Sequence, residues 1–428
     1  MRILFVTPYP PSRIRVRGYG FLSQLQKQHE VTIVAQCASE REQADAETLR
    51  KQGFEVVEVP ASRQQAILRS GLVLFSTLPL QVAYARSTAL TQTVQRLCLQ
   101  RSFDVIHVEH LRGIASMEAL ARTHPLVWDA VDCISLLSKH AMTAGPAFSV
   151  RAVARLEYKR TQRYEARMLN QLSHVVVTSQ NDREAMIALR RVSLQDVASS
   201  DDTLGSGIRV LTNGVDLAYF RPLAREQHRF NLVFSGKMSY HANIATALYL
   251  SKQIMPLIWQ RQPGATLTIV GSNPPKAVRE LASDPRVEVT GYVDDMRPYV
   301  GRAEIMLSPM VYSVGIQNKV LEAMALGTPV IVAAQAAAAL DALPGRDLLV
   351  ASSAREFAES ALRLMNDAVL RAELSQRGRA YVEQHHDWQA ITNRLVDVYQ
   401  QALVAHTREK GGIENASPVM SGKVFFQV

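Results

Sequence analysis

A lysine and a glutamate stand three residues apart in the segment GIQNKVLEAMALGTPVIVAA (315–334). Asn318 is a suitable helix N-cap, and Gly327 is placed to end the helix that follows. This spacing predicts a short helix with Lys319 in its first turn and Glu322 one turn later on the same face. Lys319 and the free N–H groups of the helix start can hold a diphosphate, while Glu322 can accept hydrogen bonds from two sugar hydroxyls. The spacing alone also allows an ordinary surface ion pair.

A second candidate for phosphate binding is the loop FSGKMSYHAN (234–243), which follows an apolar run. Gly236 lets the backbone approach a ligand closely, and Lys237 is a compact cation that suits a diphosphate oxygen. Asn243 can add a further hydrogen-bond donor. The loop is therefore predicted to contact a phosphate-bearing ligand.

A third candidate is the loop PYPPSRIRVRGYG (8–20), which carries Arg13, Arg15 and Arg17. It enters a predicted helix near Gly18, so it can offer backbone N–H groups and cations to a phosphate. A basic surface loop without a ligand is the alternative. The loop lacks the G-x-G-x-x-G pattern, which argues against a nicotinamide or flavin cofactor.

Length and composition limit the class of protein. The 428 residues are too many for one hydrophobic core, so two domains are expected. Hydrophobic residues make up 47% and charged residues 20%, as in folded soluble proteins. The three cysteines are scattered, which argues against a disulfide framework or a zinc site and fits a reducing compartment. The formal charge of +9 favours an anionic partner, such as phosphates, nucleic acid or a membrane surface.

Short apolar runs alternate with amphipathic stretches along both halves of the chain. This pattern predicts parallel strands covered by helices on both faces. The first half contains the predicted strands 2–7, 30–36, 54–59, 103–108, 126–131, 174–179 and 208–214. The second half contains the predicted strands 230–236, 265–271, 287–293, 303–309, 328–334 and 347–352. We therefore expect an α/β fold with two doubly wound domains that break near 219–229, and a ligand in the cleft between them.

A basic stripe and an apolar window raise the question of membrane contact. The stripe comprises Arg151, Arg155, Lys159, Arg163 and Arg167, with Arg160 beside them. On a helix it predicts contact with anionic lipid head groups or a phosphate-bearing acceptor. A solvated face balanced by Glu157 and Glu165 is the alternative, and nucleic acid is a weaker third interpretation. The window 66–85 is interrupted by Arg69 and Pro79, so we expect a helix on the membrane or beside an acceptor cleft rather than a spanning helix.

At this point the residues resemble a known family. GIQNKVLEAMALGTPVIV resembles the donor-site signature of family 4 glycosyltransferases, which have the GT-B fold of two Rossmann-like domains facing across a cleft. FDVIHVEH resembles the family's DVVHxH strand end, and VLTNGVDLAYFRP resembles its NGVD hinge segment. The resemblance covers roughly residues 1 to 405, and sugar transferases of exopolysaccharide systems share this style of motif.

The resemblance implies an activity and a division of the chain. It implies retaining transfer of a sugar from a nucleoside-diphosphate-sugar to an acceptor hydroxyl, without a bound metal or other cofactor. Residues 1–224 would form the acceptor-side domain and 225–387 the nucleotide-sugar domain. A C-terminal helix over 388–405 would pack back on the first domain, and 406–428 would form a mobile tail.

The carry-over of site residues is uneven. Glu322 matches the second acid of the family's E-x7-E motif, whereas the first acid falls on Val314, so backbone around Gly315 and Ile316 would have to contact the donor sugar. Lys237 matches a phosphate-binding arginine, and Asp132 stands where the family often has a histidine. The implied catalytic residues are Lys237, Lys319 and Glu322. The implied donor-binding residues are Gly236, Asn243, Val293, Gly315, Ile316, Gln317 and Asn318. The implied acceptor-side or phosphate-side residues are Arg15, Arg17 and Asp132.

The partners implied are a nucleotide-sugar donor, a glycan or lipid-linked acceptor and an anionic membrane surface, but no nucleic acid. The expected location is the cytoplasm, or the inner face of the membrane as a peripheral protein. We consider three alternatives to a glycosyltransferase. The missing acid at Val314 allows a catalytically inactive binding or scaffold protein of the same fold. A nucleotide-sugar epimerase would need further acids and histidines around the donor, and a phosphorylase would need a pyridoxal lysine motif that the sequence lacks.

Overall fold

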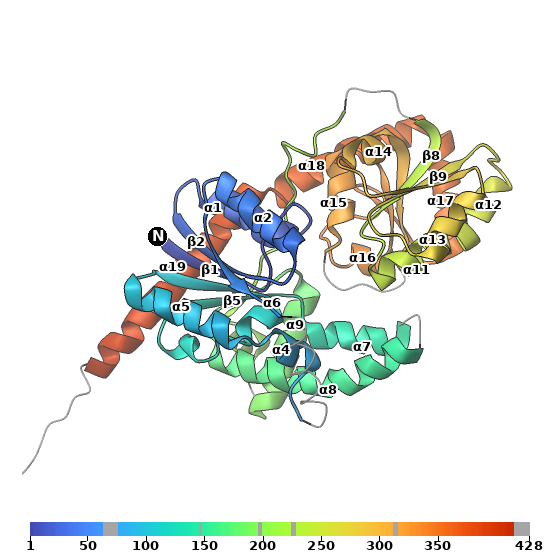
Figure 1. The fold of residues 1–428 in the computed structure, drawn as a ribbon. Helices are drawn as coiled ribbons and strands as arrows, with labels where there is room; N and C mark the ends of the chain where they lie inside the picture. The colour runs from blue at the N-terminus through green and yellow to red at the C-terminus, as the bar shows by residue number, and fades with distance from the viewer. Residues whose placement is uncertain (63–75, 145–147, 196–198, 224–227, 311–315, 415–428) are drawn as a thin grey trace, which may run out of the picture.

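The protein has two α/β domains, each built on one parallel sheet with helices on both faces (Figure 1). The computed structural model describes residues 1–428 except 63–75, 145–147, 196–198, 224–227, 311–315 and 415–428. Each of the thirteen strands expected from the sequence overlaps a strand of the structure. The predicted fold class is therefore confirmed.

The N-terminal sheet has the strand order β3-β2-β1-β4-β5-β6-β7, and all its pairings are parallel. Its strands are β1 (Arg2–Thr7), β2 (Glu30–Cys37), β3 (Glu55–Pro60), β4 (Val105–Glu109), β5 (Leu126–Val131), β6 (Val175–Val177) and β7 (Ile208–Val210). The central strands are buried along nearly their whole length, because helices cover both faces of the sheet. These helices are α1 (Val16–Leu25), α2 (Glu40–Lys51), α4 (Leu80–Ala85), α5 (Thr88–Gln100), α6 (His110–Ile114), η1 (Leu120–Arg122), α7 (Ile134–Ala144), α8 (Phe148–Gln171), α9 (Gln180–Leu194) and α10 (Asp201–Leu204).

The C-terminal sheet has the order β10-β9-β8-β11-β12-β13, which repeats the central order of the first sheet. Its strands are β8 (His228–Ser235), β9 (Thr266–Val270), β10 (Val287–Gly291), β11 (Ala303–Ser308), β12 (Val330–Ala333) and β13 (Leu349–Ala351). Its helices are α11 (His241–Tyr249), η2 (Leu250–Ile254), α12 (Met255–Trp259), α13 (Lys276–Arg279), η3 (Glu280–Ser283), α14 (Arg297–Arg302), α15 (Asn318–Ala325), α16 (Ala334–Ala337), α17 (Ala354–Asn366) and α18 (Ala368–His385). In both sheets the order reverses between two central strands, β1 and β4 in one and β8 and β11 in the other. Ligands of such sheets bind at these switch points.

The last helix, α19 (Trp388–Glu414), leaves the C-terminal domain and runs along the N-terminal one (Figure 1). Its apolar side chains join the core that contains Phe21 of α1 and Phe5 of β1. Trp388 fits against two glycines, since a Cβ added at Gly20 would lie 2.1 Å from the indole ring and one at Gly214 would lie 2.6 Å from it. The helix is longer than the expected 388–405 and extends into the segment expected to be a tail, of which 415–428 lies outside the described residues.

Among the described residues, no helix is both long and apolar enough to cross a membrane. Residues 66–75 of the apolar window lie outside the described part of the chain. The remainder of that window includes the short helix α4, whose Val82 and Ala83 are buried in the N-terminal domain.

Candidate active site

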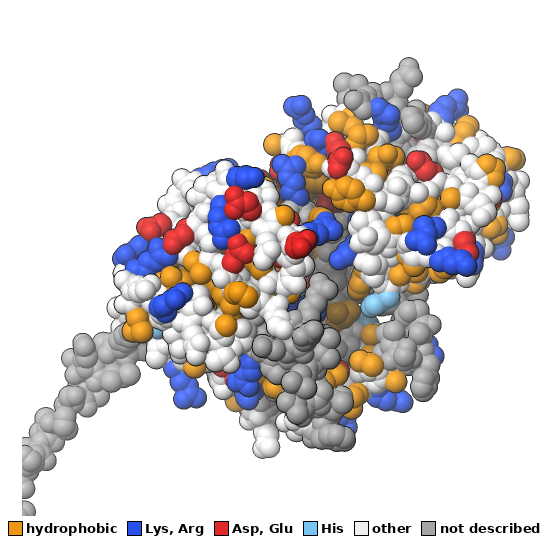
Figure 2. All heavy atoms as spheres, in the orientation of Figure 1, with side chains coloured by type: hydrophobic (Ala, Val, Ile, Leu, Met, Phe, Trp, Pro, Cys, Tyr) orange, Lys and Arg blue, Asp and Glu red, His pale blue; other side chains and the backbone are white. Residues whose placement is uncertain are grey.

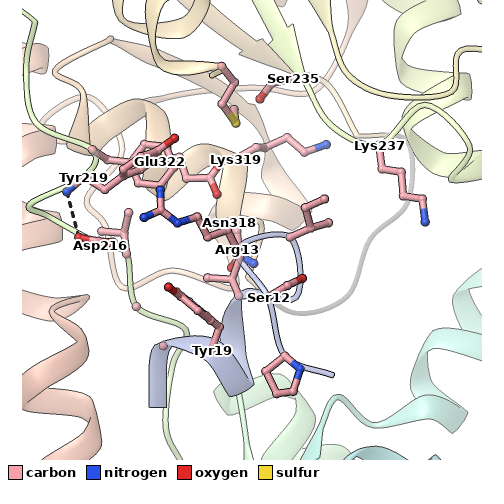
Figure 3. A pocket seen from close by; sticks show the side chains of 18 of the residues that line it. Ser12, Arg13, Tyr19, Asp216, Tyr219, Ser235, Lys237, Asn318, Lys319 and Glu322 are labelled. Atoms are coloured by element: carbon pink, nitrogen blue, oxygen red, sulfur yellow. Dashed lines mark hydrogen bonds between the residues drawn. The ribbon is translucent and has the colours of Figure 1, made fainter. Parts of the chain in front are cut away.

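The carboxyl edges of the two sheets face each other across a cavity of about 1540 Å³. Arg13, Tyr19 and Asp132 belong to the wall formed by the N-terminal domain. Lys237, Lys319 and Glu322 belong to the wall formed by the C-terminal domain (Figure 3). A cavity of this kind, between two doubly wound domains, is the default ligand site of the fold.

The floor of the cavity at the second switch point is backbone rather than side chain. Gly236 follows β8 with φ +151°, and Gly271 follows β9 with φ +155°, values that L side chains rarely adopt. A Cβ at Gly271 would lie 1.8 Å from the carbonyl oxygen of Gly236, and a Cβ at Gly236 would lie 2.7 Å from Nδ2 of Asn243. Glycine at both positions therefore keeps the strand ends close together and leaves space for a ligand.

Lys319 is held beside this floor by Asn243, not by Glu322. Its Nζ donates to Oδ1 of Asn243 at 2.6 Å, and Nδ2 of Asn243 donates to the carbonyl oxygen of Lys237 at 3.0 Å. The ammonium group lies 4.5 Å from the ring centroid of Phe234. Among the described residues no ion pair joins Lys319 to Glu322, and in Figure 3 the ammonium points away from that carboxylate. The alternative of an ordinary surface ion pair is therefore wrong.

The two charged groups of α15 have strongly shifted pKa values. Burial in the cavity wall lowers the pKa of Lys319 to about 7, and the nearby charge of Glu322 opposes this shift only in part. Burial likewise raises the pKa of Glu322 to about 7, against the opposing charge of Lys319. Each group thus lacks enough opposite charge within the protein to stay fully ionised, as is common where a ligand supplies the missing charge.

The start of α15 lies one residue earlier than the sequence indicated. Gln317 is the N-cap residue, and its Oε1 accepts a hydrogen bond from Oγ of Ser308 at 2.7 Å. Asn318 is the first helical residue, and its Oδ1 accepts from Nδ2 of Asn213 at 3.0 Å. At the other end, Gly327 has φ +78° and ends the helix as predicted.

Most of the remaining predicted donor-side residues line the cavity. Lys237 is exposed within it, and Val293, Ile316, Gln317 and Asn318 contribute to its wall. Gly315 and Val314 lie outside the described residues. The two candidate segments of the C-terminal domain, 234–243 and 315–334, are thus brought together at the carboxyl edge of its sheet.

Two predicted residues of the N-terminal domain lie elsewhere. Arg15 does not line the cavity and pairs with Glu42 at 2.6 Å. Arg17 is buried, and its Nε donates to Oδ2 of Asp129 at 2.7 Å. Both predictions of a phosphate-facing cation fail because an internal carboxylate already holds each guanidinium group.

The arginine of that loop that does reach the cavity is Arg13. Its guanidinium carbon lies 4.4 Å from the ring centroid of Tyr219, and that of Arg297 lies 3.8 Å from the same ring. Tyr219 belongs to the segment between the domains and lines the cavity together with Arg13 (Figure 3). Its ring thus lies between an arginine of the N-terminal domain and an arginine of the C-terminal domain. The sequence analysis named Arg13 among the cations of this loop, but the site residues implied by the resemblance included only Arg15 and Arg17.

Asp132 lines the cavity at the end of β5. Its Oδ1 accepts from Oγ1 of Thr178 at 3.2 Å, and burial, with the nearby charge of Asp182, raises its pKa to about 7. The preceding residue, Val131, has φ +68°, which is unusual for a β-branched side chain. Such strain often accompanies a functional position.

A buried hydrogen-bonded chain connects the two domains and was missed by the sequence analysis. Its central member is Asn213, whose Oδ1 accepts from Nη1 of Arg17 at 2.9 Å while its Nδ2 donates to Asn318. Its carbonyl oxygen also contacts Nδ1 of His386 at 2.7 Å. The signal was present in the Asn-Gly pair of the hinge segment, but nothing in the sequence identifies its partners. In the described part of the chain, no group of three or more His, Cys, Asp or Glu residues is arranged to bind a metal ion.

Comparisons with solved structures agree with this architecture. HepE of Anabaena, in a complex with UDP, superposes with a TM-score of 0.65 at 14% identity, over 94% of this chain and 100% of that one. Sucrose-phosphate synthase of Thermosynechococcus elongatus superposes with a TM-score of 0.68 at 16% identity, over 95% of this chain and 100% of that one. These likenesses define the class of protein as a two-domain GT-B fold.

Sequence comparisons identify the family. The model of the glycosyl transferase 4-like domain matches residues 15–197, and the model of the glycosyl transferases group 1 matches residues 229–367. The chain therefore belongs to the family 4 glycosyltransferases, also described as group 1.

Two curated relatives share parts of the sequence. A GDP-mannose-dependent monoacylated alpha-(1-6)-phosphatidylinositol monomannoside mannosyltransferase of Corynebacterium glutamicum is 31% identical over 160 residues, which cover 34% of this chain and 42% of the relative. A D-inositol 3-phosphate glycosyltransferase of Salinispora arenicola is 25% identical over 273 residues, which cover 56% of this chain and 59% of the relative. The chain thus matches about half the length of these relatives.

Proposed function

We propose that the protein transfers a sugar from a nucleoside-diphosphate-sugar to an acceptor hydroxyl, with retention of the anomeric configuration. The observation that carries the proposal is Lys319, a cation with a lowered pKa at the start of α15, facing a cavity large enough for both substrates. A helix start beside an under-neutralised lysine favours a diphosphate.

The donor in this proposal binds along the wall of the C-terminal domain. Lys319, Lys237 and the first N–H groups of α15 contact the diphosphate, and Glu322 accepts hydrogen bonds from the ribose. The nucleobase lies beside Val293, and the floor formed by Gly236 and Gly271 lets the diphosphate approach the backbone.

In the transfer step, the bond between the anomeric carbon and the diphosphate oxygen breaks, and its electron pair leaves with the diphosphate. The acceptor oxygen forms the new bond to that carbon, and its proton passes to the departing diphosphate. Lys319 of α15 and Lys237 after β8 stabilise the charge that develops on the leaving group, which is the main catalytic device available to this site. Asp132, in the opposite wall, accepts a hydrogen bond from a sugar or acceptor hydroxyl. In this scheme neither a metal nor another cofactor is required.

The proposal leaves base and sugar open while fixing the class of donor. The name of one curated relative specifies GDP-mannose, and structures of HepE contain UDP and UDP-glucose. We further propose that the acceptor is a glycan or lipid-linked glycan of cell-surface or exopolysaccharide synthesis, and that the protein works at the inner face of the membrane.

The test is a screen of purified protein against UDP-, GDP- and ADP-sugars, with membrane extract as the source of acceptor and nucleotide release as the signal. We expect one base to be preferred, and NMR of the product to show the donor's anomeric configuration. Failure of every donor to bind or turn over would refute the proposal. Binding without turnover would favour the inactive scaffold, and conversion of the donor sugar without an acceptor would favour the epimerase.

A further inference from the structure

Helix α8 presents a basic face that the N-terminal domain leaves exposed. Its exposed cations are Arg151, Arg155, Lys159, Arg163 and Arg167. They recur at every fourth residue, so they form a row roughly 24 Å long at 1.5 Å per residue. Figure 2 shows Lys and Arg side chains along the lower edge of the molecule, where Figure 1 places α8.

The acidic residues of α8 do not neutralise this face. Glu165 is buried, and its carboxylate accepts hydrogen bonds from the backbone N–H groups of Ile134 at 2.7 Å and Ser135 at 3.1 Å, at the start of α7. Glu157 is also buried, and its carboxylate accepts from the backbone N–H of Leu80 at 2.6 Å and pairs with Arg160 at 3.2 Å. Of these two acids, only Glu157 balances a cation in the described part of α8, and that cation is Arg160, which lies beside the exposed row.

Apolar side chains accompany the cations on the exposed side of α8. Leu156 is 49% exposed and Val153 is 55% exposed. Lys159 and Arg155 lie within one turn of Leu156 along the helix. A nucleic-acid surface gains little from an exposed leucine, whereas the interface of a bilayer takes up both apolar side chains and cations.

We propose that α8 docks the N-terminal domain on a bilayer that contains anionic lipids. Arg155, Lys159 and Arg163 contact the lipid head groups, and Leu156 and Val153 enter the boundary between head groups and acyl chains. The proposal deepens the membrane location proposed above and rests on it for its partner, but its test does not require sugar transfer.

The position of α8 relates this surface to the cleft. Helix α7 packs along α8, and its Leu137 lines the cavity. In Figure 1 the two helices extend together beneath the C-terminal domain. A bilayer held by α8 would therefore lie on the side of the cleft formed by the N-terminal domain, where a lipid-linked acceptor would enter.

The first experiment measures flotation of the full chain with phosphatidylcholine vesicles, with and without phosphatidylglycerol. A variant with Arg155→Gln, Lys159→Gln and Arg163→Gln should lose about 100-fold in partition to the anionic vesicles, since each cation near such a surface contributes about fivefold. The matched control carries Lys252→Gln, Arg261→Gln and Lys276→Gln, which remove the same charge from exposed positions of the C-terminal domain. The control should bind like the unmodified chain.

A second variant separates the apolar contribution. Leu156→Ser should weaken partition by about 5- to 10-fold and leave its salt dependence unchanged, whereas the triple variant should lose most of the salt dependence. All variants should bind nucleotide-sugar like the unmodified chain, so a failed donor site would show in that assay and not in flotation. Equal binding to neutral vesicles, or equal losses in both triple variants, would overturn the proposal. Binding of the full chain to polyuridylic acid without flotation would also overturn the proposal, because the basic face of α8 would then recognise a nucleic acid.

Discussion

The two domains share the order of their central strands but use the polar groups at their strand ends in opposite ways. At the first switch point the charged groups contact partners within the chain, since Arg17 pairs with Asp129 at 2.7 Å and Thr7 donates to Glu109 at 2.8 Å, although Nη2 of Arg17 has no hydrogen-bond partner among the described residues. At the second, Lys237 and Lys319 face a cavity without a carboxylate in direct contact among the described residues. The same fold thus holds internally paired charges at one switch point and lysines that face a cavity at the other.

The comparison indicates what turns a switch point into a ligand site. Both points offer strand ends and a following helix, so topology alone does not distinguish them. The difference lies in whether the chain supplies its own counter-charge. Among the described residues, the hydrogen-bond partners of Lys319 are neutral, namely the amide of Asn243 and the sulfur of Met310, and its pKa falls to about 7. An incoming diphosphate would therefore gain a cation that the protein has left under-stabilised.

The largest expected effect is on the charge pair at the first switch point, which we call the closed site. Asp129→Ala should lower the free energy of unfolding by about 3–5 kcal/mol, because it leaves the buried guanidinium of Arg17 without its carboxylate. Urea denaturation measures the change, and Glu383→Ala, which removes the partner of the more exposed Arg379, should cost less than about 1 kcal/mol. Nucleotide affinity of the folded variant should not change. A specific loss of that affinity, with stability intact, would mean that the first switch point is also a ligand site.

The next effect is on the second switch point, which we call the open site. There a substitution should lower activity without lowering stability. Lys319→Ala should reduce turnover about 10²- to 10³-fold, as expected for loss of a group that stabilises a leaving anion. Stability should stay the same or rise slightly, since a desolvated cation is removed. Initial rates of nucleotide release and thermal unfolding provide the two measurements, with the exposed Lys276→Ala as control. Full activity in the Lys319 variant would refute its assignment to the diphosphate.

A third prediction uses pH to examine the open site without substrate. The pKa of Glu322 is raised to about 7 in the folded protein, so between pH 4.5 and 7 the folded chain keeps a proton that the unfolded chain loses. The free energy of unfolding should therefore fall as the pH rises from 4.5 to 7. The pKa of Lys319 is lowered from 10.5 to about 7, so above pH 7 the sign reverses and stability should recover. Glu322→Gln should remove about 2 kcal/mol of this fall in the free energy of unfolding below pH 7. Unfolding followed at pH 5, 7 and 9 checks this, and an unchanged profile in the variant would contradict it.

The sequence was sufficient for the strands because both faces of each sheet are covered, which makes most of the central strands apolar along nearly their whole length. It was sufficient for the open site because Gly236, Lys237 and Lys319 are local signals at strand ends. It failed for Arg15 and Arg17 because their partners lie far along the chain. Asp129 is 112 residues from Arg17, and a cation in a loop looks the same whether its counter-ion is a ligand or a distant carboxylate.

The helix start at Gln317 was missed by one residue for a similar reason. Asn318 is the better N-cap by type, but its side chain is used by Asn213 from the hinge, 105 residues away. Tertiary contacts override local capping preference here. The exposed basic face of α8 could be predicted as a stripe, whereas the burial of Glu165 under α7 could not.

The smallest expected effect concerns the contact that links the two sites. Asn213 accepts a hydrogen bond from Arg17 of the closed site and donates one to Asn318 of the open site, so its side chain links the two domains. Asn213→Ala should raise KM for the donor and lower kcat by a few-fold each, in line with the loss of a hydrogen bond worth about 1 kcal/mol. Arg17 keeps its contacts with Asp129 and the carbonyl of Leu211, so stability should change little.

A double-mutant cycle with Asn318→Ala separates this link from a general defect. The two substitutions should be coupled by about 0.5–1.5 kcal/mol in kcat/KM, because either one removes the same contact. Asn231→Ala is the matched control, since the side-chain amide donates to Thr266 and Thr268, which lie within the C-terminal sheet. It should lower stability without coupling to Asn318. Additive effects of Asn213 and Asn318 would show that the two switch points act independently, and that the closed site only stabilises its own domain.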